Sequence, residues 1–260
     1  MPVTLSLENK VALVTGGSRG IGAATVRMFI QAGAQVAFNY QKARPAAEEI
    51  VSEFGSDRCM AVQCDLSGTE TAEHLVASAV KRFGRLDILI ANHGIWPAED
   101  VSVDMMSDTQ WLRTVDVNLN SVFALVKHSV GQMKAQSRQG NARGHIVLVS
   151  STAGQRGEAF HCDYAATKGA LISMVKGLST ELIRDGIYVN CVAPGWVETD
   201  MSQPVMSDPK ALEVVVRAIP VGRMATPVEL AAPILFLCTE HAGFITGEVF
   251  NVNGGAVLTG

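Results

Sequence analysis

A regular alternation of short β-rich runs with longer helical segments is the feature that most constrains how this chain can fold. Runs of apolar and β-branched residues bounded by turn residues predict strands at residues 10–15, 35–39, 59–63, 88–91, 145–150, 188–193 and 249–252. Helical segments are predicted at residues 21–32, 46–54, 71–83, 109–133, 164–184 and 227–237. Such alternation predicts a parallel sheet with helices on both faces. Right-handed crossovers then favour a doubly wound, Rossmann-type α/β fold with seven strands.

The composition agrees with one packed domain spanning residues 1–260. Of the 260 residues, 48% are hydrophobic and 18% charged, and no linker, repeat or low-complexity stretch is evident. The net charge of −4 argues against a nucleic-acid partner, because binding a phosphate backbone needs an excess of Lys and Arg. No apolar run approaches the roughly 20 residues of a membrane span, so we expect no membrane partner and a cytoplasmic location. Five cysteines without a Cys-x-x-Cys pair predict reduced thiols and no metal site.

A glycine-rich segment joins the first predicted strand to the first predicted helix. It reads Thr15-Gly16-Gly17-Ser18-Arg19-Gly20-Ile21-Gly22. Glycine permits the positive φ of a tight turn and lets another group approach the backbone closely. The following helix offers unpaired N–H groups and the positive end of its dipole, which together bind phosphate. We therefore predict a phosphate-binding loop, with an ordinary strand–helix turn as the alternative.

The spacing Gly-x-x-x-Gly-x-Gly resembles the short-chain dehydrogenase/reductase (SDR) family, and later motifs agree with that family in order and spacing over nearly the whole chain. The resemblance implies an NAD(P)-dependent oxidoreductase that moves a hydride between a nicotinamide ring and a carbonyl or alcohol substrate. It assigns cofactor contacts to the glycine loop, to the ends of the second, third and fourth strands, and to the turn after the sixth strand. These residues are Gly16, Ser18, Arg19, Gly20, Ile21, Gly22, Asn39, Tyr40, Asp65, Leu66, Asn92, Gly94, Pro194, Gly195, Val197 and Thr199. Between Asn92 and Gly94, His93 stands where the family usually has a small residue.

The charges after the second strand bear on which dinucleotide binds. A carboxylate there would accept hydrogen bonds from the adenosine ribose and repel the 2′-phosphate of NADP. This chain has Asn39-Tyr40-Gln41 at that place, and Arg19 in the glycine loop offers a forked guanidinium that suits a phosphate. We therefore predict NADP(H) as the cofactor, with NAD(H) as the alternative. Lys42 and Arg44 are expected to be solvated surface charges.

A second motif, Tyr164-Ala165-Ala166-Thr167-Lys168, begins the predicted helix after the fifth strand. Residues at i and i+4 share one face of a helix, so we expect the Lys168 ammonium close to the Tyr164 phenol. The pKa of a free tyrosine is ~10, and a nearby cation lowers that pKa. By resemblance to the family, Tyr164 is the catalytic acid/base, and both residues also contact the cofactor.

The resemblance implies two further catalytic residues. Ser151, thirteen residues before Tyr164, is expected to hydrogen-bond the substrate oxygen, a role that its neighbour Ser150 does not take. Asn118 is expected to hold a water molecule that connects Lys168 to solvent. Such a complete set favours an enzyme over the alternative of a non-catalytic nucleotide-binding protein.

Substrate specificity is expected to come from residues 95–107, 155–163 and 201–218, with a lid near residues 200–218. The candidate contacts are Trp96, Phe160, His161 and Met201, for which core packing is the alternative. The chain looks most like 3-oxoacyl-[acyl-carrier-protein] reductases, including its ending at residues 245–255. Those reductases attract an acidic carrier with basic residues, and Arg143 and Arg184 take the corresponding neighbourhoods.

We therefore predict reduction of a ketone or a 3-oxoacyl group with NADPH, on a small-molecule or carrier-bound substrate. An NAD-dependent sugar or secondary-alcohol dehydrogenase is the alternative, because such enzymes share the same ending. The resemblance also implies a homotetramer that associates through the two long helices and through the last helix and strand.

Overall fold

The computed structural model describes residues 4–140 and 142–259 and has a seven-stranded sheet at its centre. The strand order is β3-β2-β1-β4-β5-β6-β7, and every neighbouring pair is parallel. The strands are β1 (Val11–Val14), β2 (Gln35–Tyr40), β3 (Cys59–Gln63), β4 (Ile88–Ala91), β5 (Gly144–Val149), β6 (Ile187–Pro194) and β7 (Val249–Val252). This arrangement confirms the predicted doubly wound fold.

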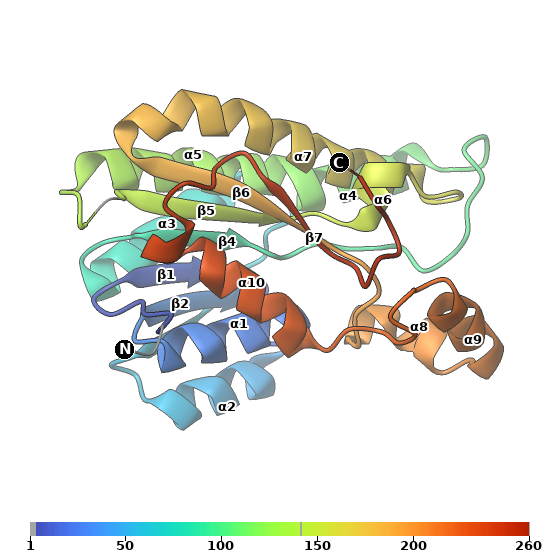
Figure 1. Cartoon of the computed structure of the whole chain (residues 1–260), viewed down its shortest axis with the longest axis horizontal. Coiled ribbons are helices and arrows are strands. Elements are labelled where there is room, and N and C mark those ends of the chain that lie inside the picture. Colours follow the sequence, from blue (N-terminus) through green and yellow to red (C-terminus); the bar gives the residue numbers. More distant parts are fainter. Residues whose placement is uncertain (1–3, 141, 260) are drawn as a thin grey trace.

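Helices cover both faces of the sheet (Figure 1). One face carries α1 (Gly20–Gln31), α2 (Arg44–Phe54) and α10 (Pro227–Leu237), and the other carries α3 (Glu70–Phe83), α5 (Ser121–Ala135) and α7 (Cys162–Leu182). The predicted helix at residues 109–133 is present, but it is built as α4 (Asp108–Val115), a π-helical turn (Asp116–Asn120) and α5. The short helices α6 (Thr152–Arg156), α8 (Gln203–Met206) and α9 (Pro209–Arg217) were not predicted. Helices α8 and α9 lie in the predicted lid and project beyond the sheet (Figure 1).

The side chains of the central strands divide between two apolar cores, one on each face of the sheet. In β1, Ala12 and Val14 belong to the core beneath α1 and α10, while Leu13 belongs to the core beneath α3, α5 and α7. This alternation follows from the period of two in a strand. Both faces are covered by helices, so the central strands are fully buried and read as continuous apolar runs.

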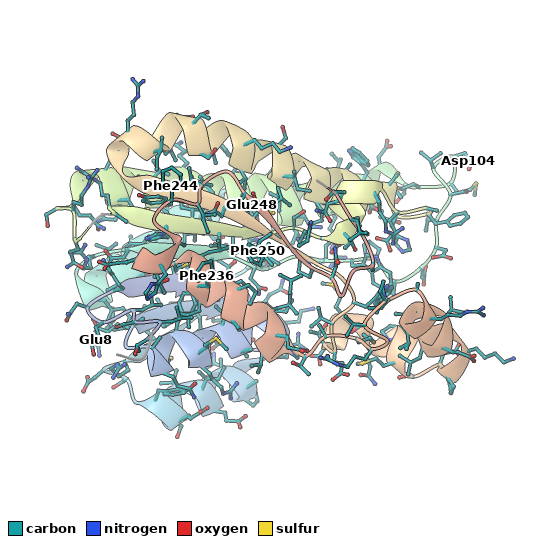
Figure 2. The ribbon with its side chains drawn as sticks, in the orientation of Figure 1. Glu8, Asp104, Phe236, Phe244, Glu248 and Phe250 are labelled. Carbon is teal, nitrogen blue, oxygen red and sulfur yellow. The ribbon has the colours of Figure 1, made fainter. Side chains whose placement is uncertain are left out.

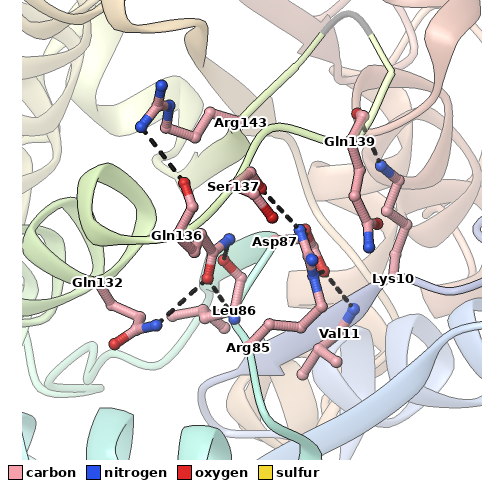
Figure 3. Close-up of polar contacts among 10 residues, drawn as sticks. All are labelled: Lys10, Val11, Arg85, Leu86, Asp87, Gln132, Gln136, Ser137, Gln139 and Arg143. Carbon is pink, nitrogen blue, oxygen red and sulfur yellow. Dashed lines mark hydrogen bonds and ion pairs between the residues drawn. The ribbon is translucent and has the colours of Figure 1, made fainter.

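Hydrogen bonds from polar side chains connect the amino ends of β1 and β4 (Figure 3). The Asp87 carboxylate accepts hydrogen bonds from the Val11 N–H at 2.9 Å and from the Arg85 guanidinium at 2.6 Å. The Gln136 amide bonds both the N–H and the carbonyl of Leu86, at 3.1 and 2.7 Å. These contacts tie the start of β4 to β1 and to the end of α5, so they fix the strands at the edge opposite their carboxyl ends.

The chain crosses over in opposite directions on the two sides of β1, which lies between β2 and β4. At such a switch point the connecting segments part and leave a crevice beyond the carboxyl ends of the strands. The glycine-rich loop follows β1 directly, so it borders this crevice.

All five cysteines are free thiols. Within residues 4–140 and 142–259, none of the helices has both the length and the apolar character needed to cross a membrane. The same residues contain no cluster of His, Cys, Asp and Glu side chains arranged to hold a metal ion.

Candidate active site

A cavity of about 570 Å³ opens at the carboxyl ends of the strands. Most of the predicted site residues line it: Gly16, Ser18, Arg19, Gly20, Ile21, Asn39, Tyr40, Asp65, Leu66, Asn92, Gly94, Trp96, Ser151, Tyr164, Lys168, Pro194, Gly195, Val197, Thr199 and Met201. Four predicted residues do not line it: Gly22, Asn118, Phe160 and His161. The volume lies within the range typical of pockets for cofactors and small ligands.

The glycine loop gives this cavity a cradle of exposed backbone. Gly16 and Gly20 have φ values of +63° and +53°, which favour glycine over residues with a side chain. A Cβ at Gly17 would lie 2.5 Å from the Cβ of Phe38, and one at Gly22 would lie 2.1 Å from the Gly16 carbonyl oxygen. Gly22 therefore shapes the loop from behind the cavity. Helix α1 starts without a side-chain cap, so its first N–H groups face the cradle and fit a pyrophosphate.

Asn39 holds this loop in place. Its side-chain oxygen accepts a hydrogen bond from the Gly16 N–H at 2.8 Å, and its amide nitrogen donates to the Cys64 carbonyl at 3.0 Å. Both ends of the side chain are therefore bound to the protein, although Asn39 lines the cavity as predicted. A carboxylate at this position could not donate to Cys64, which gives a structural reason for an amide at the end of β2.

Arg19 faces the mouth of the cavity, where it pairs with the Asp200 carboxylate. Both side chains are more than half exposed. Sequence analysis missed this acidic partner, which stands at the start of the predicted lid. Lys42 is exposed, as expected, and it also borders the cavity, whereas Arg44 bonds Gln63 at 2.8 Å on the exposed surface.

Tyr164 and Lys168 lie one turn apart on α7, as the spacing predicts. Both are buried, and the Lys168 Nζ is 5.7 Å from the centre of the Tyr164 ring. The Lys168 ammonium donates a hydrogen bond to the Val149 carbonyl at 2.9 Å. Ser151 caps α6 by accepting a hydrogen bond from the Ala153 N–H at 3.1 Å. Its neighbour Ser150 is turned away and donates to the Lys168 carbonyl at 2.7 Å.

Burial controls the protonation of this pair. It raises the pKa of Tyr164 to about 12, an effect that the charge of Glu158 increases and the hydrogen bond with Ser151 opposes. Burial also lowers the pKa of Lys168 to about 8. The expectation that Lys168 lowers the pKa of Tyr164 is therefore wrong for the chain by itself, because desolvation of the phenolate dominates. The phenol is neutral near pH 7, and this is the form that can donate a proton.

Asn118 lies behind the cavity, within the π-helical turn. Its side-chain oxygen accepts a hydrogen bond from the Ile95 N–H at 2.8 Å, and its amide nitrogen donates to the Ile95 carbonyl at 2.9 Å. The side chain therefore anchors the segment after β4. A Cβ at Gly94 would lie 3.1 Å from Asn118 Oδ1 and 3.4 Å from Lys168 Nζ, so glycine permits this close approach.

His93, the departure from the family pattern, is accommodated by hydrogen bonds. Its Nδ1 lies 2.8 Å from Thr15 Oγ1, and its Nε2 lies 2.7 Å from Ser121 Oγ. Burial lowers the pKa of His93 to about 3, so the ring is neutral. The turn keeps its form because Asn92 still donates to the Thr15 carbonyl at 3.0 Å. His93 thus links β1 and β4 to α5.

The predicted substrate contacts divide into two groups. Trp96 and Met201 line the cavity, whereas Phe160 is 54% exposed outside it and His161 is buried behind Trp96. The lining also includes Trp196 and Arg113, which sequence analysis missed, and Arg156 and Glu158, which lie in the predicted specificity segment 155–163 but were not named singly. For Trp196 a signal was present, because it directly follows the predicted turn after β6.

The two arginines expected to attract a carrier are not near the cavity within one chain. Arg143 precedes β5 and donates to the Lys134 carbonyl near the end of α5. It also donates to the Gln136 carbonyl just beyond that helix (Figure 3). Arg184 lies in the turn before β6. Both therefore lie at the amino end of the sheet, opposite the site.

A glycine cradle at the switch point of a doubly wound sheet, with a buried Tyr–Lys pair in the same cavity, defines the site of a dinucleotide-dependent oxidoreductase. A family model described as Enoyl-(Acyl carrier protein) reductase matches residues 16–257. The chain is 34% identical to a 3-oxoacyl-[acyl-carrier-protein] reductase of Synechocystis sp., over 97% of this chain and 99% of that protein. It is 35% identical to an L-rhamnose 1-dehydrogenase (NAD(P)(+)) of Sphingomonas sp., over 96% of each chain.

A solved structure shows the same likeness. The RhlG/NADP active-site complex of Pseudomonas aeruginosa has a TM-score of 0.89 and 31% identity, covering 99% of this chain and 100% of that one. The chain thus belongs to the short-chain dehydrogenase/reductase family of NAD(P)-dependent oxidoreductases, which act on CH–OH or C=O groups.

Proposed function

We propose that this protein uses NADP(H) to interconvert a ketone and its secondary alcohol, and that 3-oxoacyl compounds, free or carrier-bound, are among its substrates. The observation that carries this proposal is the meeting of Ser151, Tyr164 and Lys168 in the cavity that begins at the glycine loop. The likeness to the Synechocystis reductase supports the acyl substrate.

The lining fits a dinucleotide along its whole length. The glycine loop and the start of α1 would hold the pyrophosphate, Asp65 and Leu66 the adenine, and residues 194–199 the nicotinamide end. Arg19 would pair with a 2′-phosphate, and Asn39 at the end of β2 brings no carboxylate to repel it. When bound, the nicotinamide supplies or accepts the hydride.

Side chains of the protein donate the proton that the reduction requires. Ser151 Oγ accepts a hydrogen bond from the Ala153 N–H and also interacts with the Tyr164 hydroxyl, so a substrate oxygen that meets both hydroxyls can accept a hydrogen bond from Ser151. Tyr164, neutral near pH 7, gives its proton to that oxygen during reduction. The Lys168 ammonium then stabilises the phenolate that remains. Asn118 acts as a positioning residue through its two hydrogen bonds to Ile95.

A second function has its own support. In this structure Asp200 balances the charge of Arg19, and this balance weakens the preference for a 2′-phosphate. The likeness to the L-rhamnose dehydrogenase also supports a sugar as substrate. An NAD-dependent sugar or secondary-alcohol dehydrogenase is therefore the alternative.

Steady-state rates separate these functions. We expect NADPH to be oxidised with at least one compound from a panel of 3-oxoacyl thioesters and ketones, with kcat/KM at least about 10-fold above that with NADH, as one charge-assisted contact implies. A preference for NAD⁺ with sugars would establish the alternative. Dinucleotide binding without turnover of any ketone or alcohol would refute both and favour a non-catalytic binding protein.

For assembly, we propose a homotetramer in a reducing compartment, the cytoplasm. Leu112 on α4 and Phe123 on α5 are more than half exposed. Phe244, between α10 and β7, is fully exposed (Figure 2). Exposed apolar patches of this kind mark interfaces between subunits. The five free thiols fit a reducing location. Analytical ultracentrifugation should give four times the chain mass, and Phe244→Glu should lower that value.

A further inference from the structure

Two tryptophans, Trp96 and Trp196, line the cavity next to each other. Trp96 follows the turn after β4, and Trp196 follows the Pro194-Gly195 turn after β6. Their ring centres are 6.0 Å apart and their planes meet at 84°. Two indole rings at nearly a right angle make an aromatic corner, and we use that name for this pair.

The aromatic corner is fixed before any substrate arrives. His161, only 3% exposed, stacks on Trp96 with ring centres 4.9 Å apart and planes 17° from parallel. His161 does not line the cavity, so it covers the face of Trp96 that points away from the substrate. The Trp96 indole also lies close enough to the Glu158 carboxyl to oppose the rise that burial causes in the pKa of that carboxyl. A ring already packed on one face loses little freedom when a ligand packs on the other.

This corner and the reacting groups line one cavity. Ser151 and Tyr164 line the same cavity as both tryptophans. Glu158, which lines the same cavity, is near enough to Tyr164 for its charge to raise the pKa of the phenol. A ketone whose oxygen meets Ser151 and Tyr164 therefore places a substituent of its carbonyl carbon toward the corner.

We propose that the aromatic corner selects ketones that carry a flat aromatic ring on the carbonyl carbon, such as 3-aryl-3-oxoacyl compounds. A flat ring can stack on one indole and meet the other edge to face, and both arrangements are favourable for aromatic pairs. A saturated group of the same size gains only the burial of its surface. This inference rests on the proposed function, because the corner acts as a filter within the class of ketones.

The test compares two 3-oxo esters that differ only in the ring: ethyl 3-oxo-3-phenylpropanoate and ethyl 3-cyclohexyl-3-oxopropanoate. The ratio of their kcat/KM values with NADPH is measured in each variant, so that intrinsic reactivity cancels. We expect Trp96→Leu and Trp196→Leu each to lower the phenyl-to-cyclohexyl ratio by about 3- to 10-fold, the worth of one aromatic contact. Trp96→Phe, which keeps a flat ring, should preserve most of the ratio. Trp111→Phe, outside the cavity lining, should leave it unchanged.

A binding measurement serves as the second readout. The chain has three tryptophans, so Trp111→Phe leaves only the two of the corner to fluoresce. In this background the phenyl ester should change the emission at a lower half-saturating concentration than the cyclohexyl ester. Equal half-saturation and an unchanged kcat/KM ratio in the leucine variants would overturn the inference while ketone reduction stands. If neither ester is reduced, the panel of thioesters and ketones decides the proposed function, and the fluorescence titration still decides the inference.

Discussion

Replacing Lys168 by methionine should make the protein more stable at pH 7 while it removes the activity. Lys168 is 4% exposed, and burial lowers its pKa from 10.5 to about 8. The folded state therefore disfavours the charged form by a difference of 2.5 pKa units, which is about 3 kcal/mol at roughly 1.4 kcal/mol per unit. Methionine is of similar length and carries no charge. It loses the hydrogen bond to the Val149 carbonyl, worth about 1.5–3 kcal/mol for a charged donor, so a net gain of up to about 1.5 kcal/mol remains.

The sign of the pH dependence distinguishes this explanation from a simple packing effect. Between about pH 8 and the unfolded pKa near 10.5, the unfolded chain binds a proton at Lys168 that the folded chain has released. Stability of the unchanged protein therefore rises with pH through this window by linkage. The variant lacks this gain, so its advantage should shrink above pH 8 and vanish or reverse near pH 10.5.

Thermal unfolding of both proteins at pH 7 and at pH 10.5 measures this effect. A difference of 1 kcal/mol shifts the midpoint by about 2–4 °C for a chain of roughly this size, so the variant should unfold a few degrees higher at pH 7. The comparison uses the difference between the two proteins, because other groups also titrate and their contributions cancel. A variant less stable at pH 7, or an advantage that does not change with pH, would refute the reasoning.

Three further predictions concern the cofactor end and the amino end of the sheet. Arg19→Ala should lower kcat/KM with NADPH by about 10- to 100-fold, the worth of a charge-assisted contact, and leave the value with NADH nearly unchanged; an equal loss with both cofactors would exclude a 2′-phosphate role. Gly22→Ala should prevent dinucleotide binding, because its Cβ would lie 2.1 Å from the Gly16 carbonyl oxygen, and calorimetric titration with NADP⁺ that still shows normal affinity would contradict this. Asp87→Ala should lower the free energy of unfolding by about 3–5 kcal/mol, because it leaves Arg85 without its partner, and denaturant unfolding at constant pH checks this value.

The sequence predicts the fold, the glycine loop and the Tyr164–Lys168 pair well, because local patterns determine all three. The period of two in the strands and the glycine spacing depend on neighbouring residues, so β1 and the loop to Gly22 lie where expected. The i to i+4 spacing likewise brings Tyr164 and Lys168 together on α7.

Other features depend on contacts between distant parts of the chain and could not be predicted. The π-helical turn that carries Asn118 arises where its side chain binds Ile95 across the fold. The pairing of Arg19 with Asp200 joins residues 181 positions apart. The stack of His161 on Trp96 also requires two loops to meet. The sequence therefore predicted His161 as a substrate contact but could not show that Trp96 separates it from the cavity. The direction in which the pKa of Tyr164 shifts was wrongly predicted for the same reason, because burial is a property of the whole fold.

The role of Tyr164 is tested most directly by Tyr164→Phe, which removes one hydroxyl and keeps the ring. Binding of NADP⁺, measured by calorimetric titration, should change by no more than about 3-fold, because the glycine cradle is untouched. The turnover number for ketone reduction should fall by about 10²–10⁴, the contribution of a positioned general acid. Turnover that stays within a few fold of the unchanged protein would show that the proton comes from elsewhere.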